Sequence, residues 1–509
     1  MRRTTPLLSL LVAALASVLA LSCSGVAAPP ADEPPSEAGG GAATRAGSTA
    51  GADHADKPNI LFVMTDDMKY DDFSRVGRFG RLLTERGTSF TRAYHTNPLC
   101  CPSRVTALTG RYSHSHGVAD NDNGPNGGYE GYLAHDLQWS TLPLWLKGAG
   151  YRTALFGKYL NGYGEIAGKE APKGFDAYTH RQRDEGGDGV AQRFARALKG
   201  APGVGLPGAE DPQLGAAAAE WVDANHDRAP LYLWLCLWSP HEPLGAAQQF
   251  EGTHADDRFP RPPSFDEEDV SDKPRWAREE ARLSPDEEEQ LLGVRRTRLD
   301  MLEGSAAGLE RVLDAFSRAG ELDDTYVVFT SDNGIQLGEH RLSHMEKSVP
   351  YEESARAPLV VSGPGIPQGQ ERDELVGNID LAPTMAEWAG ADAPDADGRP
   401  LSPLLTDRPA PEEGAWRERL LVENNGEDWM PGYAAVFEGD RFRYVEWDTG
   451  ERELYDLSSD PYQATNLLHE ATPEAEARAD ELSARLRELK GCAGDSCRAA
   501  ENADAAQEG

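Results

Sequence analysis

A cysteine and an arginine four residues apart open a predicted helix in the first quarter of the chain. Residues 97–111 read NPLCCPSRVTALTGR, and the run that follows Cys100 suits the first turns of a helix. Arg104 then stands one turn past the Cys100 thiol, so a nucleophile and a permanent cation share one helix N-terminus. Backbone N–H groups and the helix dipole both favour anions there. The pattern indicates attack on an anionic group, whereas an isolated Cys100-Cys101 pair would favour a buried, inert thiol or a disulfide.

Polar side chains with acid, base or ligand chemistry follow four apolar, β-rich runs. The runs cover residues 59–64, 152–156, 231–238 and 326–330. Apolarity that is continuous rather than alternating predicts strands covered on both faces, and hence a parallel sheet flanked by helices. Ligand sites in open α/β sheets lie beyond the carboxyl ends of the strands. One crevice should therefore collect the residues that follow the runs, which are Asp66, Asp67, Lys158, His241, Asp332 and Asn333.

Two carboxylate-bearing pairs in this set predict a metal site. Asp66, Asp67, Asp332 and Asn333 offer only oxygen ligands, which a hard cation such as Ca²⁺ or Mg²⁺ prefers. Each pair alone has another interpretation, because Asp66-Asp67 could cap a helix after a strand and Asp332-Asn333 could belong to a turn. The two pairs together with the cysteine pattern favour the metal.

The charge of the chain argues against one class of partner. The 509 residues carry a formal net charge of −35, which is unsuited to nucleic acid. The acidic residues concentrate in 266–272 and 286–289, where they predict a solvated face. An anionic substrate would have to be drawn in by a local basic pocket against this field.

The N-terminus has the pattern of an export signal. Arg2 and Arg3 precede an apolar run over residues 7–21, which is too short and too N-terminal for a convincing membrane span. Cys23 follows Ala-Leu-Ser in a loose match to a bacterial lipobox. Two outcomes stay open, namely a lipidated Cys23 that tethers the protein to the outer face of the membrane, and ordinary cleavage a few residues further on. Both predict an exported chain.

Composition divides the chain after the expected signal peptide (1–23) into four parts. Residues 24–57 have the composition of a disordered linker. Residues 58–410 hold the four apolar runs and predict an α/β catalytic domain. Residues 411–497 change to short alternating strands and a charged helix, which predict a smaller α+β subdomain. Residues 498–509 are expected to be a disordered tail.

Within the catalytic domain, residues 161–215 and 245–290 are expected to lie outside the sheet. The first stretch is rich in Gly, Asp and Arg and the second in Pro and acid, so both predict long surface insertions that could carry substrate contacts. Residues 371–391 predict a final strand–helix unit. Helical patterns lie at 79–86, 142–147, 299–318 and 472–490.

Export would permit disulfides. Cys492 and Cys497 stand close together near the C-terminus, where a local bridge would pin the end of the last helix. Cys236 lies inside an apolar run and is expected to be a buried bystander.

The run from Cys100 to Arg111 resembles the activation signature of the type I sulfatases, C-x-P-S-R followed by x-x-x-L-T-G-R. The longer run over 99–121 is similar to the N-acetylglucosamine-6-sulfatase branch of that family. The resemblance covers roughly residues 57–497 and includes the ELYDL segment that starts at Glu453. It implies the alkaline-phosphatase-like fold, a mixed, mostly parallel sheet flanked by helices with a smaller C-terminal α+β subdomain.

In the resembled family, the first cysteine of the signature is oxidised to formylglycine before folding. The resemblance therefore implies conversion of Cys100 rather than Cys101, with a formylglycine-generating enzyme as a maturation partner. The hydrated aldehyde would attack sulfur and later release inorganic sulfate. The resemblance also implies one Ca²⁺ per chain, held by Asp66, Asp67, Asp332, Asn333 and the residue at position 100.

The same resemblance assigns catalytic roles to Lys158, His241 and Lys347 beside Cys100 and Arg104. The two lysines match sulfate-binding lysines, and His241 in SPHEP matches a histidine that binds the sulfate oxygens or protonates the leaving group. Each has an alternative, because a lone lysine is usually a solvated charge and a histidine could cap a strand.

The segment that follows Lys158 departs from the family pattern. The usual histidine two residues after the lysine is Leu160 here, which leaves one proton-transfer role unassigned, and Asn161 is a candidate for a polar role nearby. Further histidines that could line the pocket are His95, His114, His116 and His340.

These observations predict an exported, calcium-dependent sulfuric ester hydrolase. Its expected substrate is a sulfated sugar or related alcohol, such as 6-O-sulfated N-acetylglucosamine. Two alternatives stay open: a phosphonate monoester or phosphodiester hydrolase of the same superfamily, and a non-catalytic protein that binds sulfated glycans with Cys100 unconverted.

Overall fold

The computed structural model of the protein describes residues 57–167, 170–179, 207–409 and 415–502. The predicted signal peptide and all but the last residue of the predicted linker lie outside these ranges. Within them, no helix combines the length and the apolarity that crossing a bilayer requires.

An eight-stranded sheet lies at the centre of the fold, in the order β5-β4-β6-β1-β7-β8-β2-β9. The five strands from β5 to β7 pair in parallel, β8 is antiparallel to β7 and β2, and β9 is parallel to β2. The strands are β1 (Asn59–Thr65), β2 (Thr88–Phe90), β4 (Arg152–Gly157), β5 (Ala177–Thr179), β6 (Leu231–Cys236), β7 (Thr325–Ser331), β8 (Leu359–Ser362) and β9 (Gln370–Arg372). The predicted α/β class is confirmed, and the four apolar runs form neighbouring strands.

Continuous apolarity in these strands reflects helices on both faces of the sheet. Along β1, Ile60, Phe62 and Met64 join one buried cluster, and Leu61 and Val63 join another on the opposite face. Successive side chains of a strand point to opposite faces, so a strand covered on both sides needs an apolar residue at every position.

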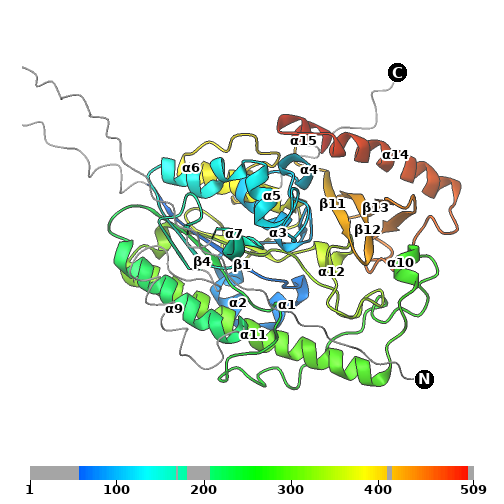
Figure 1. Ribbon diagram of the computed structural model, residues 1–509, viewed down its shortest axis with the longest axis horizontal. Helices are drawn as coiled ribbons and strands as arrows, with labels where there is room; N and C mark the ends of the chain where they lie inside the picture. Colours follow the sequence, from blue (N-terminus) through cyan, green and yellow to red (C-terminus); the bar gives the residue numbers. More distant parts are fainter. Residues whose placement is uncertain (1–56, 168–169, 180–206, 410–414, 503–509) are drawn as a thin grey trace, which may run out of the picture. The chain divides into compact units, whose positions relative to one another are not determined.

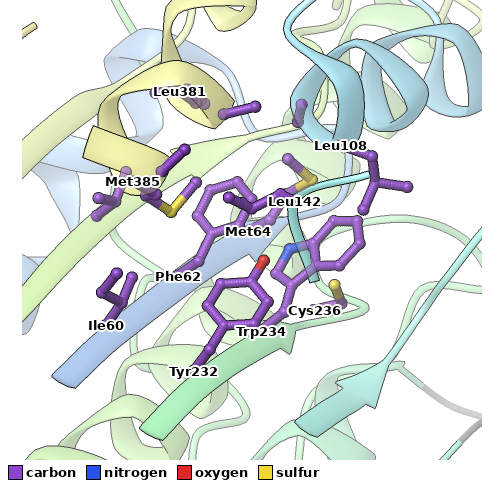
Figure 2. Packing of buried hydrophobic residues seen from close by; sticks show 14 of the residues in the cluster. Ile60, Phe62, Met64, Leu108, Leu142, Tyr232, Trp234, Cys236, Leu381 and Met385 are labelled. Atoms are coloured by element: carbon purple, nitrogen blue, oxygen red, sulfur yellow. The ribbon is translucent and has the colours of Figure 1, made fainter. Parts of the chain in front are cut away.

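The first face is covered by α3 (Cys100–Thr109), α5 (Gly128–Ala134), α6 (Leu142–Gly148) and α13 (Leu381–Ala389). Figure 2 shows Phe62 and Trp234 from adjacent strands beneath Leu108, Leu142 and Met385 from these helices. The Phe62 and Trp234 rings stack with centroids 5.5 Å apart. This packing fixes α3 against the sheet.

The second face is covered by α2 (Gly77–Leu82), α9 (Pro207–Asn225) and α11 (Pro285–Ala319), with α9 and α11 side by side (Figure 1). Helix α11 starts well before the predicted 299, at a capping box in which the Ser284 side chain accepts from the Glu287 backbone N–H. Its first turns are acidic and carry no apolar stripe, so hydrophobic periodicity could not predict them as helical.

Two other predictions need correction. The predicted helix over 79–86 is divided between α2 and a 3₁₀ turn, η1 (Thr84–Arg86). The stretch 161–215 is expected outside the sheet, but it contributes the edge strand β5; its helical parts, α7 (Tyr163–Ile166) and the start of α9, lie outside the sheet as predicted. Residues 180–206 of that stretch lie outside the described residues.

The remaining elements are short. They are α1 (Tyr70–Arg75), α4 (Ser113–His116), α10 (Arg275–Arg278), α12 (Glu352–Ala355), the paired strands β3 (Ala93–Tyr94) and β10 (Val376–Gly377), and the 3₁₀ turns η2 (Leu137–Trp139), η3 (Leu322–Asp324), η4 (Asn378–Asp380) and η5 (Ser402–Leu404).

A four-stranded antiparallel sheet follows in the C-terminal part, formed by β11 (Arg419–Glu427), β12 (Met430–Glu438), β13 (Phe442–Trp447) and β14 (Arg452–Asp456). Helix α14 (Pro473–Lys490) lies next to this sheet (Figure 1). Its Leu482, Leu486 and Leu489 belong to the same buried cluster as the strands. The predicted Cys492–Cys497 disulfide is confirmed, with Cα atoms 4.8 Å apart. Residues 498–500 were expected in the tail but complete helix α15 (Asp495–Ala500).

Candidate active site

Helix α3 presents Cys100 as its first residue. Pro102 suits the first turn, because a proline lacks the N–H that a helix start leaves unpaired. The whole helix is buried, so its N-terminus is fixed by the packing around it. The Cys100 Sγ atom lies 3.9 Å from Oδ1 of Asp66 and 3.9 Å from Oδ1 of Asp67. The candidate nucleophile therefore faces the two carboxylates that follow β1.

Strands β1 and β7 carry their polar residues to the same point, because they are parallel neighbours in register to their last residues. The Asp67 backbone N–H donates to Oδ1 of Asp332 at 3.0 Å. The Asn333 Nδ2 group donates to Oδ1 of Asp67 at 2.7 Å. The two pairs meet beside Cys100, as expected for residues that follow adjacent parallel strands.

Arg104 is fully buried against these carboxylates. Its Nε and Nη2 atoms each lie 2.9 Å from Oδ2 of Asp332, and Nη2 lies 3.9 Å from Oδ2 of Asp66. Its Nη1 atom donates to the Lys158 carbonyl at 2.8 Å. Burial would raise the pKa of Asp332, but the Arg104 charge holds it at about 2. Arg104 is thus a permanent cation fixed in one orientation.

Two lysines approach the carboxylates from separate loops. Lys158 Nζ lies 2.7 Å from Oδ2 of Asp66, and Lys347 Nζ lies 2.6 Å from Oδ1 of Asp67 and 3.0 Å from Sγ of Cys100. Burial alone would lower the pKa of each lysine, but the Asp66 charge raises the pKa of Lys158 and the Asp67 charge raises that of Lys347. Both lysines therefore stay charged at neutral pH.

Gly157 fixes the position of Lys158. It ends β4 with a φ of +112°, and a Cβ atom there would come within 1.8 Å of the Cys236 carbonyl oxygen. Only glycine adopts this conformation at no steric cost. The Lys158 N–H donates to the same carbonyl at 3.1 Å. The close approach of β4 to β6 thus explains why a glycine precedes the lysine.

Position 100 carries an uncharged side chain as long as it remains a cysteine. Burial raises the pKa of the Cys100 thiol to about 11, although Lys158 and Lys347 oppose this shift. The thiolate is the nucleophilic form of cysteine, and it is scarce when the pKa lies this high. The surrounding cations therefore face a side chain that is a weak nucleophile in its unmodified state.

His241 lies on the accessible side of the cluster, with about a third (35%) of its side chain exposed. Its Nδ1 atom lies 2.7 Å from the Glu242 carbonyl oxygen, and a carbonyl can only accept, so Nδ1 carries the proton. Its Nε2 atom lies 3.7 Å from Oδ2 of Asp67. Ligand atoms of Asp66, Asp67, Cys100 and His241 all lie within 4.8 Å of one another.

The oxygen atoms at this point fit a hard divalent cation. Within the described residues, Oδ1 of Asn333 is buried without a hydrogen-bond partner. Burial, followed by the neighbouring charge of Asp332, raises the pKa of Asp66, which reflects the crowding of carboxylates. A dication would neutralise the carboxylates and give the amide oxygen a partner. The residues that would hold it are Asp66, Asp67, Asp332 and Asn333.

The other histidines singled out from the sequence have partners away from Cys100. His95 contacts Ser103, His116 contacts Thr106, His114 contacts Glu423 and His340 contacts Glu267. Leu160 joins the apolar cluster on the first face of the sheet, and Oδ1 of Asn161 is buried without a hydrogen-bond partner in the described ranges. The proton-transfer role that the family gives to a histidine here stays unassigned.

Comparison with known families identifies the class of the chain. A family model described as "Sulfatase" matches residues 58–391, well over half of the chain. The chain belongs to the sulfatase family. A second model, described as "N-sulphoglucosamine sulphohydrolase, C-terminal", matches residues 338–491 of this sulfatase.

Named relatives agree with this assignment. The sulfatase is 28% identical to N-acetylglucosamine-6-sulfatase of Homo sapiens over 87% of its own length and 86% of the human protein. It is 32% identical to the extracellular sulfatase SULF-1 homolog of Drosophila melanogaster over 73% of its own length, but spans only 33% of that longer protein. The chain is therefore a sulfuric ester hydrolase.

Solved structures show the same fold. The structure of BT4656 in complex with its substrate D-glucosamine-2-N,6-O-disulfate matches with a TM-score of 0.67 and 22% identity, over 88% of this sulfatase and 99% of that chain. The phosphonate monoester hydrolase of Silicibacter pomeroyi matches with a TM-score of 0.68 and 22% identity, over 85% and 95% of the two chains. At this identity the likeness concerns the alkaline-phosphatase-like fold alone.

The structure adds three residues that the sequence reasoning missed. Arg298 of α11 is buried and donates to the backbone carbonyls of Asp67 and Pro240. Asp211 of α9 accepts from the backbone N–H groups that precede His241, and Asn121 accepts from the start of α3. None of the three left a signal in the sequence: Arg298 stands among other charged residues just before the helix predicted from residue 299, and all three bind backbone groups.

Proposed function

We propose that this sulfatase is an exported enzyme that removes sulfate from a sulfated sugar, with formylglycine made from Cys100 and one bound Ca²⁺. The observation that carries the proposal is the meeting of Cys100 with Arg104 and two lysines beside the carboxylates of β1 and β7. Cleaving a sulfate ester requires a nucleophile, cations around the sulfate oxygens and an acid for the leaving alkoxide.

Three cationic side chains would bind the sulfate group of the substrate. Arg104, Lys158 and Lys347 are charged and close to position 100, so a sulfate group there would exchange their carboxylate contacts for contacts with its own oxygens. Because the groups already lie beside position 100 and are largely desolvated, their contacts with the sulfate oxygens would stabilise developing negative charge. Pairing with Asp332, Asp66 and Asp67 also keeps the buried Arg104 and Lys158 and the partly buried Lys347 compatible with a folded site.

The proposed nucleophile is formed by modification of Cys100, and the proposed ion is bound from outside the chain. A formylglycine at position 100 would provide a hydrated aldehyde, and Ca²⁺ held by Asp66, Asp67, Asp332 and Asn333 would neutralise the carboxylates and orient it. The chain itself keeps residue 100 at a rigid helix start, beside Lys347. His241 is accessible and its Nδ1–H is bound to the Glu242 carbonyl, so its Nε2 atom faces the cluster; in the doubly protonated ring, the Nε2–H would bind a sulfate oxygen or give its proton to the leaving alkoxide.

The sugar substrate is supported by relatives and not by the geometry. Three relatives that the chain spans over most of their lengths are named N-acetylglucosamine-6-sulfatase. BT4656, which shares the fold, has D-glucosamine-2-N,6-O-disulfate as its substrate. A 6-O-sulfated glucosamine or N-acetylglucosamine unit is therefore the first substrate to test.

The decisive experiment measures sulfate release from N-acetylglucosamine-6-sulfate and from other monosulfated sugars, with a parallel series of an aryl sulfate, an aryl phosphonate and an aryl phosphodiester. The expected result is turnover of sulfate esters at the highest kcat/KM, with the 6-sulfated amino sugar preferred. Removal of divalent ions with a chelator should abolish turnover, and Ca²⁺ should restore it.

Two outcomes would replace this proposal with its alternatives. A phosphorus ester that reacts orders of magnitude faster than any sulfate ester would make the protein a phosphonate or phosphodiester hydrolase, in line with the fold that it shares with one. A thiol retained at position 100 together with tight binding of sulfated glycans and no turnover would make it a binding protein.

A further inference from the structure

The start of α3 has no cap from its own sequence. The residue before the helix is Leu99, which makes no side-chain capping bond, and Pro102 has no N–H. The first N–H groups of a helix have no partner within the helix. One of them, the Cys101 N–H, donates to Oδ1 of Asn121 at 2.7 Å. A side chain 20 residues along the chain thus takes the place of a cap at the first turn.

The loop that carries Asn121 is held in one shape. The Ala119 N–H donates to the Asn126 carbonyl at 2.8 Å, and the Gly128 N–H donates to the Asp120 carbonyl at 2.9 Å. Gly128 has a φ of +56°, and a Cβ atom there would meet the carbonyl oxygen of Asn121 at 3.0 Å. The backbone around Asn121 therefore has little freedom, and its carboxamide is presented to α3 from a fixed position.

The same turn of α3 is tied to the lysine that follows β4. Arg104 donates to the Lys158 carbonyl at 2.8 Å, and the Asn161 backbone N–H faces the Cys101 thiol. Residue 101 is thus held between Asn121 on one side and the segment after Lys158 on the other. Any rotation of this turn would move residue 100, whose Sγ lies 3.0 Å from Lys347 Nζ.

We infer that Asn121 is a positioning residue for the nucleophile at position 100, acting through the Cys101 N–H and not by contact with substrate. The inference rests on the proposed function, since it assumes that residue 100 carries out the attack. Loss of the carboxamide oxygen would free the first turn of α3 and misplace residue 100 relative to Arg104 and Lys347. Misplacement of a reacting group by about 1 Å can lower a rate by about 100-fold.

The test compares three variants of the full chain with the wild type. Asn121→Ala removes the acceptor, Asn121→Asp keeps an acceptor oxygen at the same place, and Asn123→Ala is the matched control. Asn123 lies in the same loop, and its Oδ1 accepts from the Glu130 N–H at 3.4 Å instead of from α3. For each protein, kcat and KM are measured, and the conversion of Cys100 is measured by peptide mass spectrometry.

The expected result is a fall in kcat of about 10-fold to 100-fold for Asn121→Ala, with KM within about two-fold of the wild type and conversion unchanged. Asn121→Asp should recover most of the lost kcat, because a carboxylate also caps a helix N-terminus. Asn123→Ala should retain the wild-type kcat. This separation of kcat from KM, with rescue by the conservative variant, is not expected of a residue that only stabilises the loop.

Three results would overturn the inference: an unchanged kcat in Asn121→Ala, an equal loss in Asn123→Ala, or a loss that follows reduced conversion of Cys100. The ratio of the kcat of each variant to the kcat of the wild type is measured with the ester that the wild type hydrolyses fastest. The activity of the wild type on sulfate esters tests the proposed function separately. The inference about Asn121 and the proposed function can therefore fail independently.

Discussion

At the scale of single residues, the adjacent cysteines differ in what they touch, and this predicts opposite results for two substitutions. The Cys100 thiol lies beside Lys347 and the carboxylates, whereas the Cys101 thiol faces the Asn161 backbone N–H. Cys100→Ala should lower kcat by at least about 1,000-fold, because it removes the nucleophile. Cys101→Ala should keep most of the activity. Sulfate release by the two purified variants provides the measurement.

The control for the Cys100→Ala and Cys101→Ala variants is a measurement of their thermal stability. Cys100→Ala removes one small side-chain group at a site built from charged groups, so the melting temperature of the variant should stay close to that of the wild type. Equal loss of activity in both variants would contradict the choice of Cys100. An intact thiol at position 100 in a fully active sample would contradict the conversion to formylglycine.

The residues of the cluster differ in how far the sequence could predict them. Asp66, Asp332 and Lys158 each follow an apolar run, so strand prediction and the strand-end rule were enough to bring them together. Arg298 and Asn121 were not predictable, because they bind backbone groups whose positions depend on the finished fold. The partner of Arg298, the Asp67 carbonyl, lies 231 residues away. Lys347 lies in a loop without regular structure, and only the resemblance to a family pointed to it.

At the scale of elements, prediction succeeded where burial leaves a pattern in the sequence. Strands β1, β4, β6 and β7 are buried on both faces, so their apolar runs were visible. Strand β5 has only three residues and β9 ends in a buried arginine, so neither has a run long enough to detect. The predicted division into domains at residue 410 stays a prediction, since residues 410–414 lie outside the described ranges.

Helix α9 and the segment that carries His241 are linked by one buried carboxylate, which predicts a pH effect. Asp211 accepts from the Trp238 and Ser239 backbone N–H groups at 2.9 and 3.1 Å, and from Ser305 Oγ at 2.7 Å. Burial nevertheless raises the pKa of Asp211 to about 6, from a usual value of 3.8. A group with a raised pKa in the folded state holds its proton more tightly there than in the unfolded chain. Its contribution to stability is therefore full below pH 3.8 and is lost as the pH rises through about 6.

Asp211→Asn removes this ionisation. Between pH 4 and pH 7 the free energy of unfolding of the wild type should fall by roughly 3 kcal/mol relative to the variant. Denaturant unfolding at a series of pH values measures the difference, with Asp223→Asn, an exposed position of the same helix, as the control. Parallel curves for wild type and Asp211→Asn would show that the carboxylate titrates normally. The variant should also lower kcat, because an amide cannot accept from all three donors near His241.

At the scale of the whole molecule, the basic cluster is enclosed in a strongly acidic protein. The net charge is −35, yet the buried Arg104 and Lys158 and the partly buried Lys347 gather at one point. Glu427 of the β11–β12 hairpin lies close to that point, because it accepts from Ser348 Oγ at 3.1 Å. Anionic substrates must therefore approach through a repulsive field before they meet the cations.

This arrangement predicts that salt speeds the capture of highly charged substrates. Raising the ionic strength from about 0.01 M to about 0.15 M shortens the screening length from about 30 Å to about 8 Å, which weakens the long-range repulsion more than the contacts inside the site. The kcat/KM for a multiply sulfated oligosaccharide should rise by about three-fold or more over this range, whereas that for a monosulfated sugar should change little. Glu427→Gln combined with Asp122→Asn, an exposed acid whose charge acts on Glu427, should reduce the salt effect. A kcat/KM that falls with salt for the oligosaccharide would mean that the buried cations, and not the net charge, govern its approach.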